Sequence, residues 1–458
     1  MEYISTRNKN LKYNFKDIFF RGLAPDGGLF IPNQIKKYSE AEIKKLSLLS
    51  YVDLATEIIF NFCSPSLEKN KLNNIIKKSY KSFSSKEVIE LKKFGNLNLI
   101  ELYHGPTLAF KDIAMQVLGN MYDEFNISSN NKINIIVATS GDTGSAAIAA
   151  LNDRKNINVF VLHPHKKISN IQRKIMTTIG SSNVYNIAIK GTFDDCQKLV
   201  KEMFSENNFR EKINMSGVNS INWARIICQI VYYFYSYFKF QNKKVSFAVP
   251  TGNFGDVFAG YVAKKMGLPI EKLIVATNEN DILERVINTG EYKPTKVKPS
   301  LSPSMDVQIS SNFERLLFDV LNEDDKQVSI FMNDLKSKGS FLLNKEQIAI
   351  IKKDFNAKKI NDKETIEIIK NFSKEYNFVI DPHTATAVGA SKDIKDGSEI
   401  LILGTAHPYK FLETIKMATS QEVETPKQIA HLMDKKENYD ILENKIKDVK
   451  SYILGKIS

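Results

Sequence analysis

The middle of this 458-residue chain alternates between short apolar runs and segments with helical periodicity. The apolar runs, which are rich in β-branched residues, cover 133–138, 158–164, 184–191, 245–250, 272–277 and 399–407. Such runs have the length and composition of buried strands, and most are followed by a helix-forming segment. Strands that alternate with helices form parallel sheets whose faces the helices cover. We therefore predict an α/β architecture with parallel or mixed sheets flanked by helices.

The two ends of the chain depart from this alternation. The first hundred residues begin with the turn-rich GLAPDGGLFIP and continue with helical periodicity near 41–49, 51–61 and 67–82. We expect them to form a separate N-terminal region, residues 1–100. Residues from about 290 to 360 are more polar and predict an insertion. Roughly the last 30 residues predict one charged amphipathic helix.

Charge and composition argue against several classes of protein. The formal net charge is +12, but the lysines are scattered among acidic residues, and no arginine-rich tract is present. We interpret this charge as a solvated surface that also favours anionic substrates, and we expect no nucleic-acid partner. No apolar run approaches the ~18 residues of a membrane-spanning helix, and the opening MEYISTRNKN lacks an apolar signal segment. We therefore expect a cytoplasmic protein without a membrane partner.

Cysteine and histidine do not predict a metal site. The three cysteines, Cys63, Cys196 and Cys228, lie far apart in the sequence and form no paired motif. His163 and His165 flank a proline, but no cysteine or carboxylate lies at ligand spacing beside them. We interpret the histidine pair as part of a loop after a strand, and we expect neither a metal nor a disulfide framework.

One lysine has an unusual setting. The stretch HGPTLAFKD, residues 104–112, places Lys111 directly after an apolar run and behind a Gly-Pro turn, and a helical pattern follows. Burial lowers the pKa of an amine and makes it a nucleophile that can react with an aldehyde. The alternative is an ordinary lysine whose stem packs on Phe110 while its ammonium group reaches water.

Two glycine-rich loops, TSGDTG at 139–144 and TGNFGD at 251–256, each lie between an apolar strand and a helix. A helix N-terminus presents unpaired N–H groups, and glycine lets an anion approach the backbone closely. Neither loop matches a Walker A motif or a dinucleotide fingerprint, and each alone could be only a tight turn. Two anion sites and a buried amine together suit pyridoxal phosphate, which carries an aldehyde and a phosphate, and an amino-acid substrate.

Five blocks of the sequence resemble threonine synthases of the bacterial and yeast type. In chain order they read HGPTLAFKD, ATSGDTGSAA, TGNFGDVFAGYVAKKMGLP, PSMDVQISSNFERLLF and LGTAHPYKF, and the likeness begins near YISTRN and GLAPDGGLFIP. The resemblance implies the tryptophan-synthase-β-like fold, which is fold type II of the pyridoxal-phosphate enzymes. It also implies a large cofactor domain, residues 101–112 with 223–458, and a small mobile domain, residues 113–222.

The resemblance assigns cofactor-binding roles by matching positions. Lys111 resembles the catalytic lysine that forms the Schiff base with pyridoxal phosphate. Thr405 resembles the hydroxyl residue that faces the pyridine nitrogen, and Asp142 falls where related enzymes usually carry Asn beside the ring hydroxyl. The loop whose backbone amides hold the cofactor phosphate is matched by Gly252, Asn253, Phe254, Gly255 and, at its end, Asp256.

Substrate-binding roles follow in the same way. The substrate-facing residues of the first glycine-rich loop are matched by Thr139, Ser140 and Thr143. The group that binds the phosphate of the substrate is matched by Asn219, Ser220 and Arg225, in NSINWAR. Structural alternatives exist for these positions: Asn219 and Ser220 could only cap the following helix, Arg225 could be a structural arginine, and Thr405 a hydroxyl at the end of a strand.

The reaction that the resemblance implies converts O-phospho-L-homoserine and water into L-threonine and phosphate, the last step of threonine biosynthesis, in a monomer. A related phospho-lyase could instead eliminate phosphate from the same substrate and give a keto acid and ammonia. Sulfhydrylases and dehydratases of this fold usually show SGN in place of SGD and lack the PSMD block. A catalytically silent amino-acid-binding protein could also keep the fold, although the presence of Lys111 argues against it.

Overall fold

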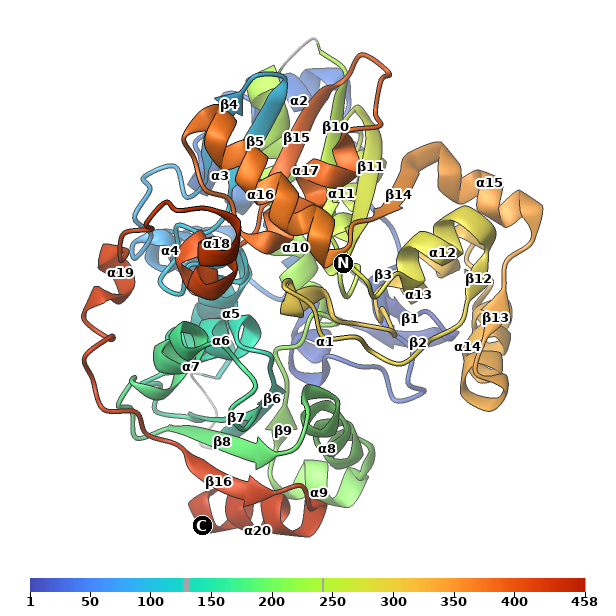
Figure 1. Cartoon of the computed structure of the whole chain (residues 1–458). Coiled ribbons are helices and arrows are strands. Elements are labelled where there is room, and N and C mark those ends of the chain that lie inside the picture. The colour runs from blue at the N-terminus through green and yellow to red at the C-terminus, as the bar shows by residue number, and fades with distance from the viewer. Residues whose placement is uncertain (127–131, 241–242, 458) are drawn as a thin grey trace.

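A six-stranded sheet forms the centre of the computed structural model, which describes residues 1–126, 132–240 and 243–457 (Figure 1). All neighbouring strands in it run parallel except the hairpin of β4 and β5 at one edge. In spatial order the strands are β14 (Phe355–Lys359), β11 (Ile270–Thr277), β10 (Val245–Pro250), β15 (Glu399–Gly404), β5 (Leu97–Glu101) and β4 (Glu90–Phe94).

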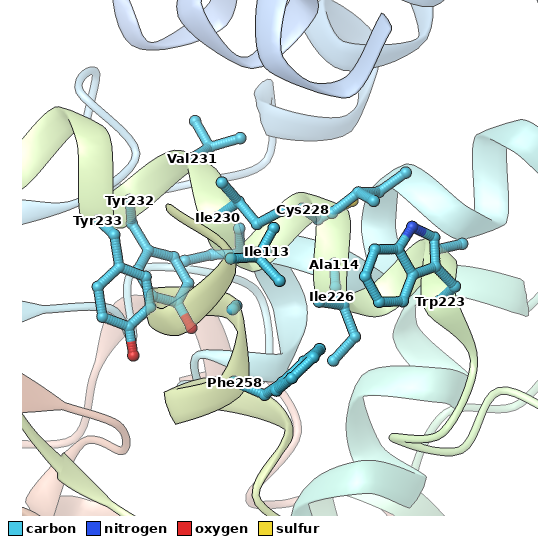
Figure 2. Close-up of a cluster of buried hydrophobic side chains, with 14 of the residues drawn as sticks. Ile113, Ala114, Trp223, Ile226, Cys228, Ile230, Val231, Tyr232, Tyr233 and Phe258 are labelled. Carbon is cyan, nitrogen blue, oxygen red and sulfur yellow. The ribbon is translucent and has the colours of Figure 1, made fainter. Parts of the chain in front are cut away.

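Helices cover both faces of this central sheet, as its sequence pattern requires. Along β10, Phe247 and Val249 pack in one hydrophobic cluster with α10 (Trp223–Tyr237) and α11 (Gly255–Lys265). Ala248 belongs to a second cluster, on the opposite face, with α16 (Asp362–Tyr376) and α17 (Pro382–Ser391). A strand that is apolar on both faces fits a parallel sheet between two helical layers. Figure 2 shows part of the first cluster, where Trp223, Ile226 and Phe258 lie together.

A second, five-stranded sheet is entirely parallel and lies below the first in Figure 1. Its order is β16 (Asp440–Glu443), β8 (Val184–Lys190), β7 (Ile157–Pro164), β6 (Ile133–Ala138) and β9 (Met215–Ser216). The helices around it are α6 (Asp142–Leu151), α7 (Asn170–Thr177), α8 (Phe193–Ser205), α9 (Asn207–Lys212) and α20 (Ile446–Ile457). The six strands predicted from the apolar runs are confirmed: they are β6, β7, β8, β10, β11 and β15.

The end of the chain does not form the single helix expected from its sequence. After α18 (Leu412–Ala418) it forms the short α19 (Lys427–Ala430), then β16, and only then α20. β16 pairs in parallel with β8, so the chain passes from the large sheet to the smaller one in its last 40 or so residues (Figure 1). The prediction was wrong because β16 is a mostly exposed edge strand with charged residues at both ends, which gives a weak strand pattern.

Residues 1–80 of the N-terminal region pack beside both sheets, whereas residues 90–100 of that region form β4 and most of β5 of the central sheet. Residues 1–80 contain a three-stranded sheet, β2 (Asn8–Tyr13), β1 (Tyr3–Ser5) and β3 (Phe30–Pro32), with α1 (Phe15–Arg21). Three helices follow at the positions that the sequence predicts: α2 (Glu40–Leu46), α3 (Tyr51–Cys63) and α4 (Lys69–Tyr80). α5 (Lys111–Asn126) then packs against α4, α6 and α10. It therefore lies among helices of the N-terminal region and of both sheets.

About half of the polar stretch from about 290 to 360 is helical, and the rest is turns, loops and short strands. The stretch contains β12 (Glu291–Tyr292), α13 (Phe313–Val320), α14 (Asp325–Lys338), β13 (Phe341–Leu342) and α15 (Lys345–Asp354), after α12 (Ile282–Thr289). Its last residues form β14, so they complete the edge of the central sheet. Among the helices of the described residues, none is long and apolar enough to cross a membrane.

Candidate active site

Lys111 is the first residue of α5, and the turn before it is built around its neighbour Asp112. The Asp112 carboxylate accepts hydrogen bonds from the Thr107 amide, at 2.8 Å, and from the Thr107 hydroxyl, at 2.7 Å. A Cβ atom on Gly105 would lie 2.3 Å from the Cβ of Asp112, so only glycine fits there. The Gly-Pro turn therefore folds back onto the start of α5 and fixes the direction in which Lys111 leaves the helix.

The loop before Lys111 is also joined to the end of β15. The Phe110 amide donates to the Thr405 carbonyl at 2.9 Å, and the His407 amide donates to the Leu108 carbonyl at 3.1 Å. These bonds bring Thr405 next to Lys111, although the two are far apart in the sequence. Thr405 is 5% exposed, and its hydroxyl has no hydrogen-bond partner among the described residues. The hydroxyl is therefore available to a group bound beside Lys111.

Asp142, the first residue of α6, gathers four side chains around its carboxylate. On Oδ1 it accepts from Lys410 Nζ at 2.5 Å and from Gln172 Nε2 at 2.9 Å. On Oδ2 it accepts from Ser304 Oγ at 3.0 Å, and Lys111 Nζ lies 3.6 Å away. The structure thus brings two predicted site residues together and adds three that the sequence reasoning had not selected.

The electrostatics of this cluster leave Lys111 easy to deprotonate. Burial is the largest cause that lowers the pKa of Lys111, the positive charges of Arg225 and Lys410 act in the same direction, the carboxylate of Asp142 opposes them, and together they bring the pKa to about 8. Burial opposes the ionisation of Asp142, but Lys410 and Lys111 outweigh it and hold the pKa of that carboxyl well below its usual range. An ionised carboxylate beside a lysine whose pKa is lowered to about 8 suits a site of acid–base chemistry.

The second glycine-rich loop has the geometry of an anion site. Phe254, the residue before α11, has a left-handed backbone with φ 62°, and the amides of residues 252–255 have no acceptor among the described residues. A Cβ atom on Gly252 would lie 2.8 Å from the Ser304 carbonyl oxygen. The loop is therefore close to Ser304, whose hydroxyl donates to Asp142. Unpaired amides at the start of a helix, beside Lys111 and Asp142, fit the phosphate of pyridoxal phosphate.

Asp256, in contrast, does not face this loop. Its Oδ1 accepts hydrogen bonds from the hydroxyls of Tyr232, at 2.5 Å, and Tyr233, at 2.9 Å. Burial raises the pKa of Asp256 to about 6, although both tyrosines and Arg225 favour its ionised form. The two hydroxyls lie on the same side of α10 in Figure 2. These contacts join α10 to the first turn of α11.

Arg225 is buried and forms no salt bridge within the described part of the chain, although Asp256 lies near enough to raise its pKa. It is 2% exposed, and the one hydrogen bond that its side chain makes to the described residues is a long one, from Nη1 to the Val218 carbonyl at 3.4 Å. Its Nε atom has no acceptor among the described residues. Burial lowers the pKa of Arg225 to about 10, so the group is still a cation at neutral pH. A buried guanidinium with unused donors costs free energy unless an anion binds to it.

The residues before Arg225 offer further free donors. Asn219 and Ser220 are half-buried, and neither side chain has a hydrogen-bond partner among the described residues. The cap of α10 is Asn222, whose side chain accepts from the Ala224 amide, so neither Asn219 nor Ser220 caps this helix. A Cβ atom on Gly255 would lie 3.7 Å from the Ser220 carbonyl oxygen, which places this segment beside the α11 loop.

The three predicted residues of the first glycine-rich loop differ in whether their hydroxyl groups bond to the loop itself. Thr139 is buried, and its hydroxyl accepts from the amides of Gly141 and Gly144, each at 2.9 Å, so it shapes the turn. Ser140 and Thr143 are half-buried, and their hydroxyls have no partner within the part of the chain that the structure describes. Ser140 and Thr143 are therefore the members of this set that are free to bind a ligand.

The PSMD and SSNFER block, quoted above only for its resemblance, has a structural task here. Asn312 Nδ2 donates to the Asn253 carbonyl at 2.9 Å and to the Ser220 carbonyl at 3.3 Å. Arg315 is fully buried, donates to Asn312 Oδ1 and lies over the ring of Trp223. Sequence reasoning missed these contacts because they join segments that lie far apart in the chain. Asn312 therefore holds the loop before α11 and the segment before α10 in register.

Three family models match the chain in sequence order. Residues 2–80 match "Threonine synthase N terminus", residues 96–405 match "Pyridoxal-phosphate dependent enzyme", and residues 384–453 match "Threonine synthase, C-terminal". The threonine synthase of Pseudomonas aeruginosa is 40% identical over 99% of this chain and 98% of its own length. That of Saccharomyces cerevisiae is 43% identical over 91% of this chain and 89% of its own length.

Solved structures give the same result. The pyridoxal-phosphate-bound threonine synthase of Brucella melitensis superposes with a TM-score of 0.95 and 41% identity, over 100% of this chain and 99% of that one. The yeast threonine synthase superposes with a TM-score of 0.93 and 40% identity, over 100% and 98%. The predicted fold and cofactor are confirmed. The chain belongs to the threonine synthase family of pyridoxal-phosphate-dependent enzymes.

Proposed function

We propose that the chain converts O-phospho-L-homoserine and water into L-threonine and phosphate at the site around Lys111. The observation that carries this proposal is Arg225, a buried cation that forms no salt bridge among the described residues, although Asp256 is near enough to raise its pKa, and that is close enough to Lys111 to lower the pKa of that lysine. A dianionic phosphate on the substrate would supply the missing partner. Pyridoxal phosphate, when bound, supplies an aldehyde for amines and a conjugated ring that takes up electron density from the substrate.

Lys111 carries the proton transfers in this proposal. Its lowered pKa provides a neutral amine at mildly alkaline pH, which can take a proton from Cα of the substrate. Phosphate leaves from Cγ only if a proton is also lost from Cβ. Lys111 can take this second proton once it has passed the first one to solvent or to the conjugated ring that pyridoxal phosphate would supply. Water then adds at Cβ, and the protons return to carbon. Asp142 stays ionised throughout and holds the ammonium form of Lys111 near the reacting carbons.

The other predicted residues orient the two ligands. The amides of 252–255 would hold the cofactor phosphate, and the Thr405 hydroxyl would face the pyridine nitrogen, as the family resemblance implies. A neutral hydroxyl does not keep that nitrogen protonated, as a carboxylate would, so the site relies more on stabilising the leaving phosphate. Arg225, with Asn219 and Ser220, neutralises that phosphate as it departs. Ser140 and Thr143 bind the remaining polar groups of the substrate, and the buried Thr139 keeps their loop in shape.

At the level of the whole chain, we propose a monomer that acts in the cytoplasm. When substrate binds, the small domain, residues 113–222 together with β16 and α20 of the smaller sheet, closes over the large domain, which is the rest of residues 101–112 with 223–458. The site supports this division because its residues come from both parts: Asp142 from the first and Lys410 from the second. Closure would exclude water until it is needed for addition at Cβ.

Product analysis tests the proposed reaction. The purified chain, loaded with pyridoxal phosphate, is incubated with O-phospho-L-homoserine, and threonine, phosphate, ammonia and keto acid are all measured. We expect threonine and phosphate in equal amounts. Phosphate accompanied by ammonia and a keto acid would assign the chain to the elimination reaction instead, and the absence of phosphate release would reject both. A Lys111→Ala chain serves as the control for uncatalysed breakdown.

A further inference from the structure

A second buried lysine shares the carboxylate that Lys111 uses. Lys410 lies in the short helical turn Pro408–Phe411 after β15, and it is fully buried. Its Nζ donates to the Thr107 carbonyl at 3.0 Å and lies 2.5 Å from Asp142 Oδ1. Lys111 Nζ is 3.6 Å from the other oxygen of the same carboxylate. Two cations therefore compete for one buried anion, and Lys410 is the closer of the two.

The distances of the two lysines from Asp142 affect the pKa of Lys111. A carboxylate within about 4–6 Å favours the charged form of a lysine, and a second cation at similar range disfavours it. Lys410 occupies Oδ1 and repels the ammonium of Lys111, so both of its effects weaken the hold of Asp142 on Lys111. Without Lys410, the same carboxylate would be left to Lys111 alone.

We propose that Lys410 is a positioning residue that pairs with Asp142 and thereby keeps Lys111 free to act as a neutral amine. This inference rests on the proposed role of Lys111 and adds a residue that acts on it through Asp142. Lys410 is not a base itself in this scheme, because its ammonium is engaged by Thr107 and Asp142.

The groups that surround Lys111 are consistent with this assignment. The charged groups that affect it are Asp142, Arg225 and Lys410, and the ring of Phe110 lies 5.6 Å from its Nζ. Around the Asp142 carboxylate, the neutral donors are Gln172 and Ser304, and His383 also contributes charge when protonated. Of the cations in this neighbourhood, Lys410 makes the shortest contact with Asp142.

Competitive labelling of amines measures this effect without any substrate. The full-length, cofactor-free chain reacts with trace acetic anhydride over a range of pH, and mass spectrometry follows the peptide that contains Lys111. In the unchanged chain we expect half-maximal labelling of Lys111 near pH 8. In Lys410→Met the midpoint should move upward by about one pH unit or more, because repulsion is lost and the Asp142 attraction remains. An unchanged or lowered midpoint would overturn the proposal.

Two further variants keep the test decisive. Lys416→Met removes an equal charge from an exposed position of α18 and should leave the midpoint at the value of the unchanged chain. Asp142→Asn should lower the midpoint of Lys111, and adding it to Lys410→Met should bring the raised midpoint back down. If Lys410→Met does not fold, a midpoint that fails to fall in Asp142→Asn still contradicts the scheme. The labelling needs no turnover, so its failure is distinguishable from a failure of the product analysis.

Discussion

At the scale of single residues, Arg225 says most about what the site binds. A guanidinium offers five donors, and here they are desolvated and nearly unused, because the side chain is buried and makes one long hydrogen bond to a carbonyl. A buried, unpaired guanidinium destabilises the folded chain, and a bound anion would offset this cost. The planar fork of arginine also matches a phosphate better than the single ammonium of lysine does.

Arg225→Lys should therefore lower kcat/KM for O-phospho-L-homoserine by about 10²–10³-fold, because the leaving phosphate loses paired donors in the transition state. The affinity for pyridoxal phosphate should change far less. Steady-state kinetics and a cofactor titration measure the two quantities separately. Arg210→Lys, on α9, is the matched control and should behave like the unchanged chain. Near-normal turnover in Arg225→Lys would remove this residue from the phosphate site.

At the scale of elements, the start of α11 depends on a close approach between two backbones. Gly252 faces the backbone of Ser304 and Met305. A Cβ atom on residue 252 would lie 2.8 Å from the Ser304 carbonyl oxygen and 3.2 Å from the Met305 Cα. Backbone atoms cannot move aside as the end of a side chain can. The left-handed Phe254 then turns the chain into α11, while its ring lies 5.5 Å from that of Phe313. The loop is thus shaped from both sides.

Gly252→Ala should push this loop away from Ser304 and weaken the binding of pyridoxal phosphate. An overpacked site of this kind costs about 1–3 kcal/mol, which corresponds to roughly a tenfold to hundredfold rise in the cofactor Kd. Fluorescence titration of the cofactor-free chain measures it. Gly180→Ala is the control, because a Cβ atom there meets nothing within 4 Å. Equal affinities for the two variants would show that the loop does not hold the cofactor.

Individual strands and side chains show which parts of the structure the sequence predicts and which it does not. Apolar runs predicted β6 and β10 well, because a strand buried on both faces leaves a continuous apolar signal. Lys111 could be singled out from the sequence because an apolar run, Leu108 to Phe110, directly precedes it. Lys410 also follows a Pro-Tyr pair and precedes Phe411, but its significance depends on Asp142, which only the folded chain brings to it. A contact between residues that lie far apart in the chain leaves no pattern in the sequence around either residue.

At the scale of the whole molecule, the C-terminal segment links the two sheets. After α18 the chain crosses to the smaller sheet, where Glu437 pairs with Arg173 of α7 through two hydrogen bonds of 2.7 and 2.9 Å. β16 then extends that sheet, and α20 covers it with Val449 and Ile453, both fully buried. The smaller sheet therefore includes residues from both the middle and the end of the chain.

Ile453→Ala should destabilise the fold by about 2–5 kcal/mol, because it opens a cavity between α20 and α8. Denaturant unfolding, followed by circular dichroism, measures the loss. The control is Ile441→Ala on β16, where the side chain is 47% exposed and little stability should be lost. If Ile453→Ala were as stable as this control, α20 would not be part of the core of the smaller sheet.

The role of Lys111 is tested by finding which amine carries pyridoxal phosphate. The chain is loaded with pyridoxal phosphate, reduced with borohydride to make the attachment permanent, digested, and mapped by mass spectrometry. We predict that the added mass lies on Lys111 alone. Attachment to Lys410, its neighbour across Asp142, or to any other lysine would contradict the account.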